Sequence, residues 1–240
     1  MHSASLLSLL HLCDSLFPTG GFAHSDGLEA ATAAGRVSAS SDLRAWMDVC
    51  LDEGLARVEG PAVWRARQAW SERRRTDLDT LNAEVYALRP SSAGRSASRA
   101  MGARLIKTWQ EVHPERATAI AGGPDSGSLP RMSDATLGSG MMLPVAFGVI
   151  CAAAGIDARS AVEGFIYTRL AATASSALRL MSIGQREAHV LLAATLARVP
   201  LTVDAIEAAV VRGDDLGAFT PAIDIAMMGQ QYVRSRLFLS

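Results

Sequence analysis

Side chains that could bind a metal or transfer protons gather close to the start of the chain. The set consists of His11, Cys13, Asp14, His24, Asp26 and Glu29. Imidazole, thiolate and carboxylate groups are ligands that nickel and zinc accept in proteins. Their spacing, however, fits no recurrent ligand pattern, and nothing identifies a partner or a pocket for Asp26 and Glu29 as an acid–base pair. We therefore predict structural roles for these side chains and no metal site.

The motifs of common nucleotide-dependent and metal-dependent enzymes are missing from the sequence. It contains no glycine–lysine–serine/threonine tripeptide, so a P-loop is excluded. It also contains no H-E-x-x-H zinc motif, no G-x-S-x-G nucleophile elbow and no EF-hand loop. We predict no catalytic residues and no bound cofactor, and hence a non-catalytic protein.

A run of arginines, Arg73 to Arg75, could contact nucleic acid or could form a solvated helix end. Cations suit the carboxyl end of a helix, where the dipole is negative. Asp77 and Asp79 follow directly, and the whole chain has a net charge of −1. Because phosphate binding depends on an excess of cations, nucleic acid is not an expected partner.

The end of the chain is rich in large apolar and arginine side chains. Termini are normally polar and frayed unless other parts of the fold hold them. Aromatic side chains together with arginine are typical of protein–protein interfaces. Two interpretations remain open: a tail over 232–240 that binds a partner, and a tail that packs on its own core. The residues concerned are Tyr232, Arg234, Arg236, Leu237 and Phe238.

The elements that must position these residues are helices. Apolar residues recur at intervals of three and four along 42–58 and along 101–112, as on a helix with one buried face. Ser41 is placed to cap the first of these helices, and Pro114 to end the second. No stretch alternates apolar and polar residues between turn signals, so strands are not expected. The sequence predicts an all-α fold: a single-domain helical bundle over 1–240, with about eight to ten helices.

Glycine and proline mark the expected breaks between helices. Gly60-Pro61 is one of them, and a short helix over 203–211 is expected to begin after Pro200. The largest break is 114–140, where glycine, proline and serine are dense. We expect a flexible surface loop there.

Two features bear on the compartment in which the protein works. The apolar run from Met141 to Ala154 is shorter than the about 20 residues that span a bilayer, so it is predicted to be a buried core helix. Cys13, Cys50 and Cys151 are odd in number and widely spaced, which argues against a disulfide framework. The start of the chain does not read as a signal peptide. We expect a cytoplasmic protein that does not enter a membrane.

The strongest turn signal lies in segment 16–29. Pro18 fixes its own φ, and Gly20 and Gly21 can adopt backbone conformations closed to other residues. Together they are expected to turn the chain sharply and to set Phe22 against the helix that follows.

Other positions are expected to shape helix ends. Ser25 or Asp26 can cap the helix after the turn, and Gly27 belongs to the same structural elbow. Gly184 interrupts the helical pattern just before Gln185. That second break either joins two helices or faces a partner.

Four blocks of the sequence resemble the UreF family of urease accessory proteins. The string L-F-P-T-G-G-F-A-H-S-D-G-L-E over 16–29 is similar to the family's P-x-G-G-F-x-x-S-x-G-L-E signature. Residues 144–148 are similar to its P-V-x-F-G segment, and 179–185 to its R-L-x-x-L-G-Q block. The closing S-R-L-F-L-S over 235–240 is similar to its last block, S-R-L-F-x-S. These blocks occur in the family's order and spread over nearly the whole chain.

The resemblance implies a homodimeric scaffold that binds the accessory protein UreD, called UreH in some systems. That complex would recruit the GTPase UreG and deliver nickel to apo-urease. Arg236, Leu237 and Phe238 are expected to bind UreD, while the N-terminal turn and 179–185 would shape the dimer or the surface facing UreG. The expected partner-binding residues are Phe22, His24, Glu29, Arg179, Gln185, Tyr232, Arg234, Arg236, Leu237 and Phe238.

The chain departs from the family pattern just before Pro144. Met142 and Leu143 stand there, where family members often carry a histidine, so any role of that histidine does not carry over. Two alternative functions stay open. One is a GTPase-activating regulator of UreG that inserts an arginine at the phosphates. The other is a nickel-binding protein that uses the N-terminal histidine, cysteine and aspartate side chains.

Overall fold

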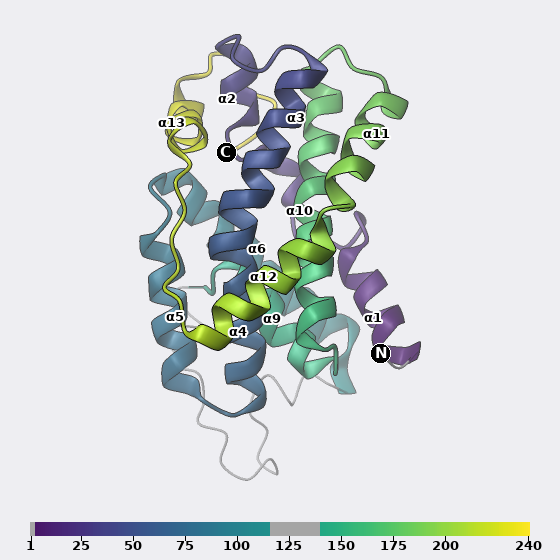
Figure 1. Cartoon of the computed structure of the whole chain (residues 1–240), viewed down its shortest axis with the longest axis vertical. Coiled ribbons are helices and arrows are strands. Elements are labelled where there is room, and N and C mark those ends of the chain that lie inside the picture. The colour runs from purple at the N-terminus through teal and green to yellow at the C-terminus, as the bar shows by residue number, and fades with distance from the viewer. Residues whose placement is uncertain (1–2, 116–139) are drawn as a thin grey trace.

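Helices packed side by side make up the part of the chain that the structure describes (Figure 1). The computed structural model describes residues 3–115 and 140–240, and no strand occurs within these two ranges. The predicted all-α, single-domain bundle is confirmed. The flexible loop predicted over 114–140 lies, apart from its two ends, outside the described residues.

Four helices form the core: α4 (Gly60–Ser71), α6 (Ser92–Val112), α9 (Leu143–Ala153) and α10 (Ala158–Leu180). Helix α9 packs on the other three, and all its residues from Leu143 to Cys151 are buried. The core helix predicted from the apolar run is therefore confirmed. Gly148 lets α9 lie directly on α4, because a Cβ at this position would overlap the Val63 carbonyl oxygen and stand 2.9 Å from the Ala66 Cβ.

One continuous helical rod runs through α3 (Ser40–Val49), a π-helical stretch (Cys50–Glu59) and α4. The break predicted at Gly60-Pro61 is therefore wrong. The wider turn of a π-helix moves the preceding carbonyl groups away from the proline ring, so Pro61 is accommodated without ending the helix. The carbonyl of Arg57, four residues before the proline, accepts the N–H of Gly217 at 3.4 Å.

The start of α3 also differs from the prediction. Ser41 lies inside the helix and does not cap it. The Asp42 carboxylate reaches back instead and accepts the N–H groups of Ser38 and Ala39, both at 2.9 Å. These backbone hydrogen bonds lower the pKa of Asp42.

The chain continues through α11 (Gln185–Leu196), α12 (Val199–Arg212) and α13 (Pro221–Gly229). Helix α12 crosses the rod obliquely in Figure 1, and it starts before Pro200, which lies in its first turn rather than ahead of it. Among the described residues, Gln185–Arg212 is the stretch long and apolar enough to cross a membrane by length and composition. In the structure it consists of two helices, and Arg198 at their junction pairs with Asp48 and Asp52.

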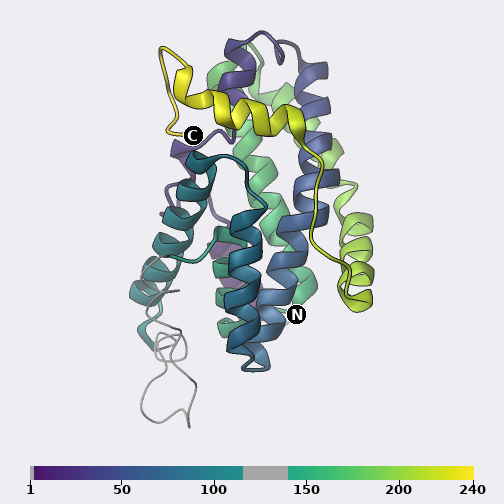
Figure 2. The same cartoon turned by 90° about the vertical axis from the view of Figure 1, so that its left-hand side faces the viewer.

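The remaining elements are α1 (Ser3–Cys13), α2 (Leu28–Ala33) and α5 (Arg75–Ala87). Helix α1 packs on α10 at Gly164, where a Cβ would stand 2.7 Å from Leu9 Cδ1 and 2.9 Å from Cys13 Sγ. Figures 1 and 2 place the C-terminus beside α2, while the start of α1 lies toward the other end of the bundle. The N-terminal turn in segment 16–29 and the last residues of the chain therefore lie close together.

Candidate interaction site at the C-terminal tail

The N-terminal turn uses left-handed backbone conformations. Gly20 and Gly27 have φ values of +79° and +86°, the region that glycine favours. Asp26 is also left-handed, at +49°, and the short helix Gly21–Ala23 lies between the two glycines. The turn leads the chain from α1 along α10 and into α2. Pro18, at its outer side, is exposed.

The last residues of the chain lie against this turn as an extended segment. The N–H of Leu239 donates to the Ala23 carbonyl at 2.7 Å, and the N–H of Ser25 donates to the main-chain oxygen of Ser240 at 2.6 Å. The His24 Nδ1 and the Ser240 hydroxyl are 2.7 Å apart. His24, predicted to contact a partner, thus holds the tail inside this molecule.

Glu29 is the central acceptor of the site. Its side chain is only 3% exposed, and its two carboxylate oxygens accept the N–H groups of Leu237 at 2.5 Å and Phe238 at 3.2 Å. The side-chain amide of Gln230 donates to the same carboxylate. One buried carboxylate in the first turn of α2 therefore fixes the path of the tail.

Phe238 anchors the tail in the body of the protein. The ring is 3% exposed, and the Arg179 guanidinium lies over it at 4.3 Å from the ring centroid. The same guanidinium donates to the Phe22 carbonyl at 3.2 Å. Arg179, near the carboxyl end of α10, thus joins the first and the last block of the sequence. Gln185 is exposed at the start of α11, after Gly184, whose φ is −80°.

The outward side chains of the same region are large and apolar. Tyr232 is 79% exposed, Leu237 57%, Leu239 69% and Phe22 57%. Arg234 and Arg236 are exposed beside them. Of the two interpretations of the tail, the structure shows packing on its own core for Phe238 and Ser240, and leaves the alternate side chains uncovered.

A partly buried network of charges lies beneath the turn. Arg169 on α10 pairs with Asp26 and, at 3.5 Å, with Glu59, while Arg89 pairs with Glu59 from the other side. Burial would raise the pKa of Asp26, but the charges of Arg169 and Arg89 outweigh it and lower the pKa. The network ties the N-terminal turn to the rod and to the end of α5.

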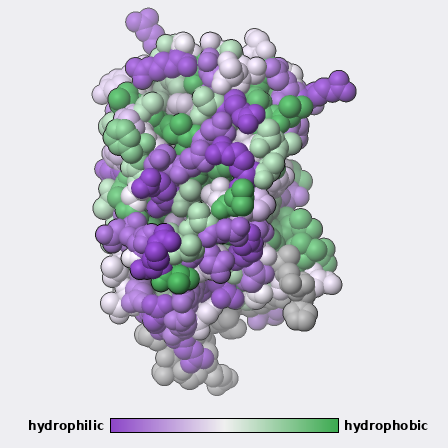
Figure 3. Space-filling model, viewed as in Figure 1, coloured by the Kyte–Doolittle hydropathy of each residue, from purple (hydrophilic) through white to green (hydrophobic). Residues whose placement is uncertain are grey.

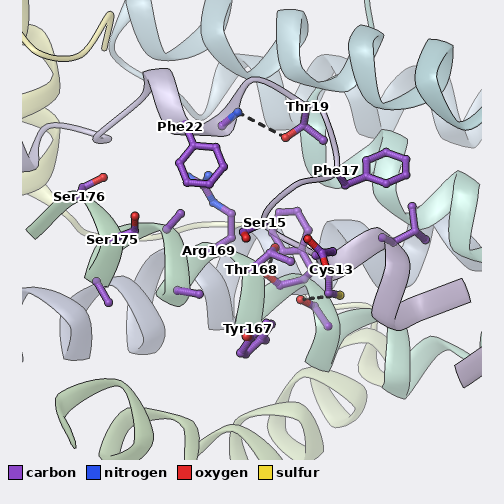
Figure 4. Close-up of a pocket in the computed structure, with 18 of the residues that line it drawn as sticks. Cys13, Ser15, Phe17, Thr19, Phe22, Tyr167, Thr168, Arg169, Ser175 and Ser176 are labelled. Carbon is purple, nitrogen blue, oxygen red and sulfur yellow. Dashed lines mark hydrogen bonds between the residues drawn. The ribbon is translucent and has the colours of Figure 1, made fainter. Parts of the chain in front are cut away.

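A cavity of about 910 Å³ opens between α1, the turn and α10 (Figure 4). Phe22 and Phe17 border it from the turn, and Tyr167 from α10. Cys13 also lines it and donates to the Gly164 carbonyl at 3.5 Å. Burial raises the pKa of this thiol to about 12, so it stays protonated at neutral pH.

The side chains first considered as metal ligands point to different partners. His11 packs edge-on against Phe17, with ring centroids 5.1 Å apart. Asp26 pairs with Arg169, and Glu29 holds the tail. Within 3–115 and 140–240, no group of three or more histidine, cysteine, aspartate or glutamate side chains is arranged to hold a metal ion.

A second apolar surface lies on α1. Leu6, Leu7 and Leu10 are exposed, and so is Leu16 just after the helix. Figure 3 shows apolar side chains gathered on the right-hand side of the molecule, where Figure 1 places α1. The face seen in Figure 3 is otherwise mixed, with charged side chains between small apolar areas.

Sequence reasoning missed two parts of the site. Gln230, 1% exposed, carries no periodic signal and is recognisable only once the tail and Glu29 are in place. The pairing of Asp26 with Arg169 joins residues far apart in the chain, and no local pattern announces it. The signal that could be found was the pair of blocks at the two ends of the sequence.

The fold and the site define an all-helical protein whose tail is held by its own N-terminal turn and presents apolar side chains outward. Comparison with known proteins agrees with this class. The UreF family model matches residues 37–196. The chain is 31% identical to the urease accessory protein UreF of Methylibium petroleiphilum over 238 residues, which cover 99% of this chain and 95% of the relative.

Other relatives give the same result. The chain is 30% identical to the urease accessory protein UreF of an Azoarcus species, over 98% of this chain and 95% of the relative. It is 29% identical to that of Paenarthrobacter aurescens, with both chains covered in full. The chain therefore belongs to the UreF family of urease accessory proteins, and its function is in urease maturation.

Proposed function

We propose that this chain is a non-catalytic scaffold of urease maturation that binds UreD and recruits the GTPase UreG, so that nickel reaches apo-urease. The tail site is the observation that supports this proposal. It joins the first and last blocks that resemble the family, and its outward side chains Tyr232, Leu237 and Leu239 are more than half exposed. Uncovered apolar side chains beside arginines suit a surface that another protein covers.

The same site also separates the residues assigned to each partner from those that support the fold. Glu29, His24 and Phe238 are buried and serve as supports, whereas Tyr232, Leu237 and the exposed Arg234 and Arg236 are available to UreD. The region from Arg179 to Gln185, in which Arg179, Ser182 and Gln185 are exposed, lies at the same end of α10 and is assigned to UreG or to a homodimer contact. The protein would act in the cytoplasm, where its partners are assembled.

Co-purification tests the proposal. The full chain, with UreD and UreG from the same source, is compared with a chain that ends at 231, and circular dichroism checks that the shortened chain keeps its helices. We expect the full chain to retain both partners and the shortened chain to lose UreD. A full chain that retains neither partner would contradict the scaffold function.

GTP turnover by UreG, measured in the same mixture, separates a scaffold from a regulator. A passive scaffold leaves the turnover of UreG unchanged when UreD is absent. A large acceleration by this chain alone would favour the GTPase-activating alternative.

A further inference from the structure

Helix α6 carries an excess of positive charge. It contains four cations, Arg95, Arg99, Arg104 and Lys107, and a single carboxylate, Glu111. One side of the helix packs on α9, and α6 forms the left-hand edge of the bundle in Figure 2. Arg95 and Arg99 are neighbours one helical turn apart, and so are Arg104 and Lys107. We call these four side chains the α6 cationic surface.

The two arginines nearest the start of α6 are held by groups that carry no charge. The Arg95 guanidinium donates to the main-chain carbonyl of Arg89 at 2.6 Å, and Arg99 Nε donates to that of Gly140 at 3.4 Å. Both guanidinium groups also lie over the Tyr86 ring, at 5.2 and 5.1 Å from its centroid. These contacts restrict the two side chains but do not neutralise their charges.

The α6 cationic surface lacks the carboxylates that accompany arginines elsewhere. In the part of the chain that the structure describes, none of its three arginines forms an ion pair. Lys107 has one partner, Glu111 at 3.9 Å, and both side chains are largely exposed. On α10, by contrast, the exposed Arg159 pairs with Asp204 and Glu163. The positive charge of α6 is therefore available to a partner.

The four cations lie close enough to act together. Residues 95 to 107 span about 18 Å along a helix, so the distance along the axis from one cation to the next is less than the Debye length of about 10 Å in about 0.1 M salt. A guanidinium group binds a carboxylate through two parallel hydrogen bonds. Arginines that are already held lose less conformational freedom when they bind. This combination favours an acidic ligand.

We propose that the α6 cationic surface is a docking site for a carboxylate-rich surface of another protein of the urease-maturation assembly. This inference rests on the proposed function, in which the chain holds more than one partner. The site is distinct from the tail site in its chemistry, because its contacts are ionic, whereas the outward side chains of the tail are mainly apolar.

A protein fits this surface better than a nucleic acid does. Four cations neutralise about four phosphates, and the whole chain has a net charge of −1, so binding to a polyanion would be weak in physiological salt. A folded acidic surface can place a few carboxylates opposite the four cations. It can also cover the Tyr86 ring, which is 38% exposed beside two of the arginines.

Charge reversal tests the proposal with the full-length chain. Arg95→Glu/Arg99→Glu is compared with Arg36→Glu/Arg73→Glu, which makes the same change in net charge at two exposed arginines outside α6. Binding to UreD, UreG and apo-urease from the same source is titrated at about 50 mM and about 300 mM salt. We expect the affinity for one of these proteins to fall at least about tenfold in the α6 variant alone, and its wild-type affinity to fall with salt.

Lys107 gives a second test that leaves the arginines intact. It is the only lysine of the chain, and its side chain is 78% exposed. A carbodiimide joins an amine to a carboxyl group as an amide, with loss of water and no spacer. In a Glu111→Gln background, which removes the internal partner, we expect mass spectrometry to find Lys107 linked to an aspartate or glutamate of the bound protein. Lys107→Arg keeps the charge, so it should bind equally and give no link at this position.

The outcomes separate the docking site from the proposed function. Equal affinities of the two charge-reversal variants for all three proteins, or a complex without a link at Lys107, would overturn the docking site alone. Duplex DNA that binds the wild-type chain and is lost with Arg95→Glu/Arg99→Glu, while the three proteins are unaffected, would also overturn it in favour of a nucleic acid. Failure of the wild-type chain to bind any of the three proteins would overturn the proposed function as well.

Discussion

The core around α9 and the tail site are stabilised in different ways. In the core, apolar helices touch along their backbones, as at Gly148, and α9 carries no charged side chain. At the tail site, a buried carboxylate, an arginine and main-chain hydrogen bonds hold an extended segment. Close packing tolerates no displacement, whereas a hydrogen-bonded segment can keep one face bound and offer the other. The first region makes the fold, and the second carries the proposed binding surface.

We expect the largest effect on stability from a substitution at the place where the core and the tail site join. Arg169→Ala leaves the partly buried Asp26 without its cation and Glu59 with Arg89 alone, and should lower the free energy of unfolding by about 3 kcal/mol. Urea denaturation measures it. Arg159, on the same helix, makes ion pairs at the surface with Asp204 and Glu163, and Arg159→Ala should change stability little. Equal effects of the two substitutions would argue against a structural role for the partly buried network.

A change of one methyl group tests the close packing of the core. Gly148→Ala places a Cβ against the backbone of α4 and should destabilise the protein by about 2 kcal/mol. Gly54 has open space around it, so Gly54→Ala should stabilise by about 0.5 to 1 kcal/mol through helix propensity alone. Thermal unfolding followed by circular dichroism compares the two. The account of the core is wrong if both substitutions shift the midpoint in the same direction.

A substitution in the tail should change hydrogen exchange in the tail rather than the stability of the whole fold. Phe238→Ala removes the buried ring beneath Arg179, so the amides of Leu237 and Leu239 should exchange with solvent about tenfold faster. The melting temperature should change little, because the core does not depend on the tail. Leu239→Ala, which trims an outward side chain, is the control and should leave exchange unchanged. A large drop in melting temperature for Phe238→Ala would show that the tail belongs to the core.

The smallest expected effect is a pH dependence of hydrogen exchange in the tail. Burial lowers the pKa of His24 below its ordinary 6.5; the charge of Asp26 opposes this shift, and those of Arg169 and Arg104 add to it. Because the pKa is lowered only in the folded state, His24 of the unfolded chain is protonated at a higher pH than His24 of the folded chain. The contribution of neutral His24 to stability is therefore present above pH 6.5 and is lost as the pH falls below it. Hydrogen exchange of the tail at pH 7.5 and 5.5, corrected for intrinsic rates, measures it. In His24→Asn the corrected difference should vanish.

The sequence predicted those parts of the fold that depend on local patterns. The apolar run of Met141 to Ala154 contains the buried core helix α9, because so apolar a helix is stable in water only when other helices cover it. Gly60-Pro61 was misread as a break, because the π-helical turn that accommodates the proline depends on contacts beyond the local sequence. Local sequence patterns indicate the intrinsic preference of a segment for helix or turn, and tertiary packing overrides that preference.

The site could be predicted only in its parts. The two end blocks contain residues that meet in the structure, but nothing in them showed that Glu29 and Phe238 face each other's segment rather than a partner. That arrangement depends on contacts between residues about two hundred positions apart. The outward side chains Leu237 and Leu239 could be separated from Phe238 only after the strand alternation of the tail was known.

The most direct test of the account is the affinity for UreD of a chain carrying Leu237→Asp and Leu239→Asp. Leu201→Asp with Val211→Asp is the matched control, because these side chains are apolar and at least as exposed but lie on α12. The account predicts at least about a tenfold loss for the tail variant, since charge replaces the apolar contact, and no change for the control. Equal affinity of the tail variant and the wild-type chain would contradict it.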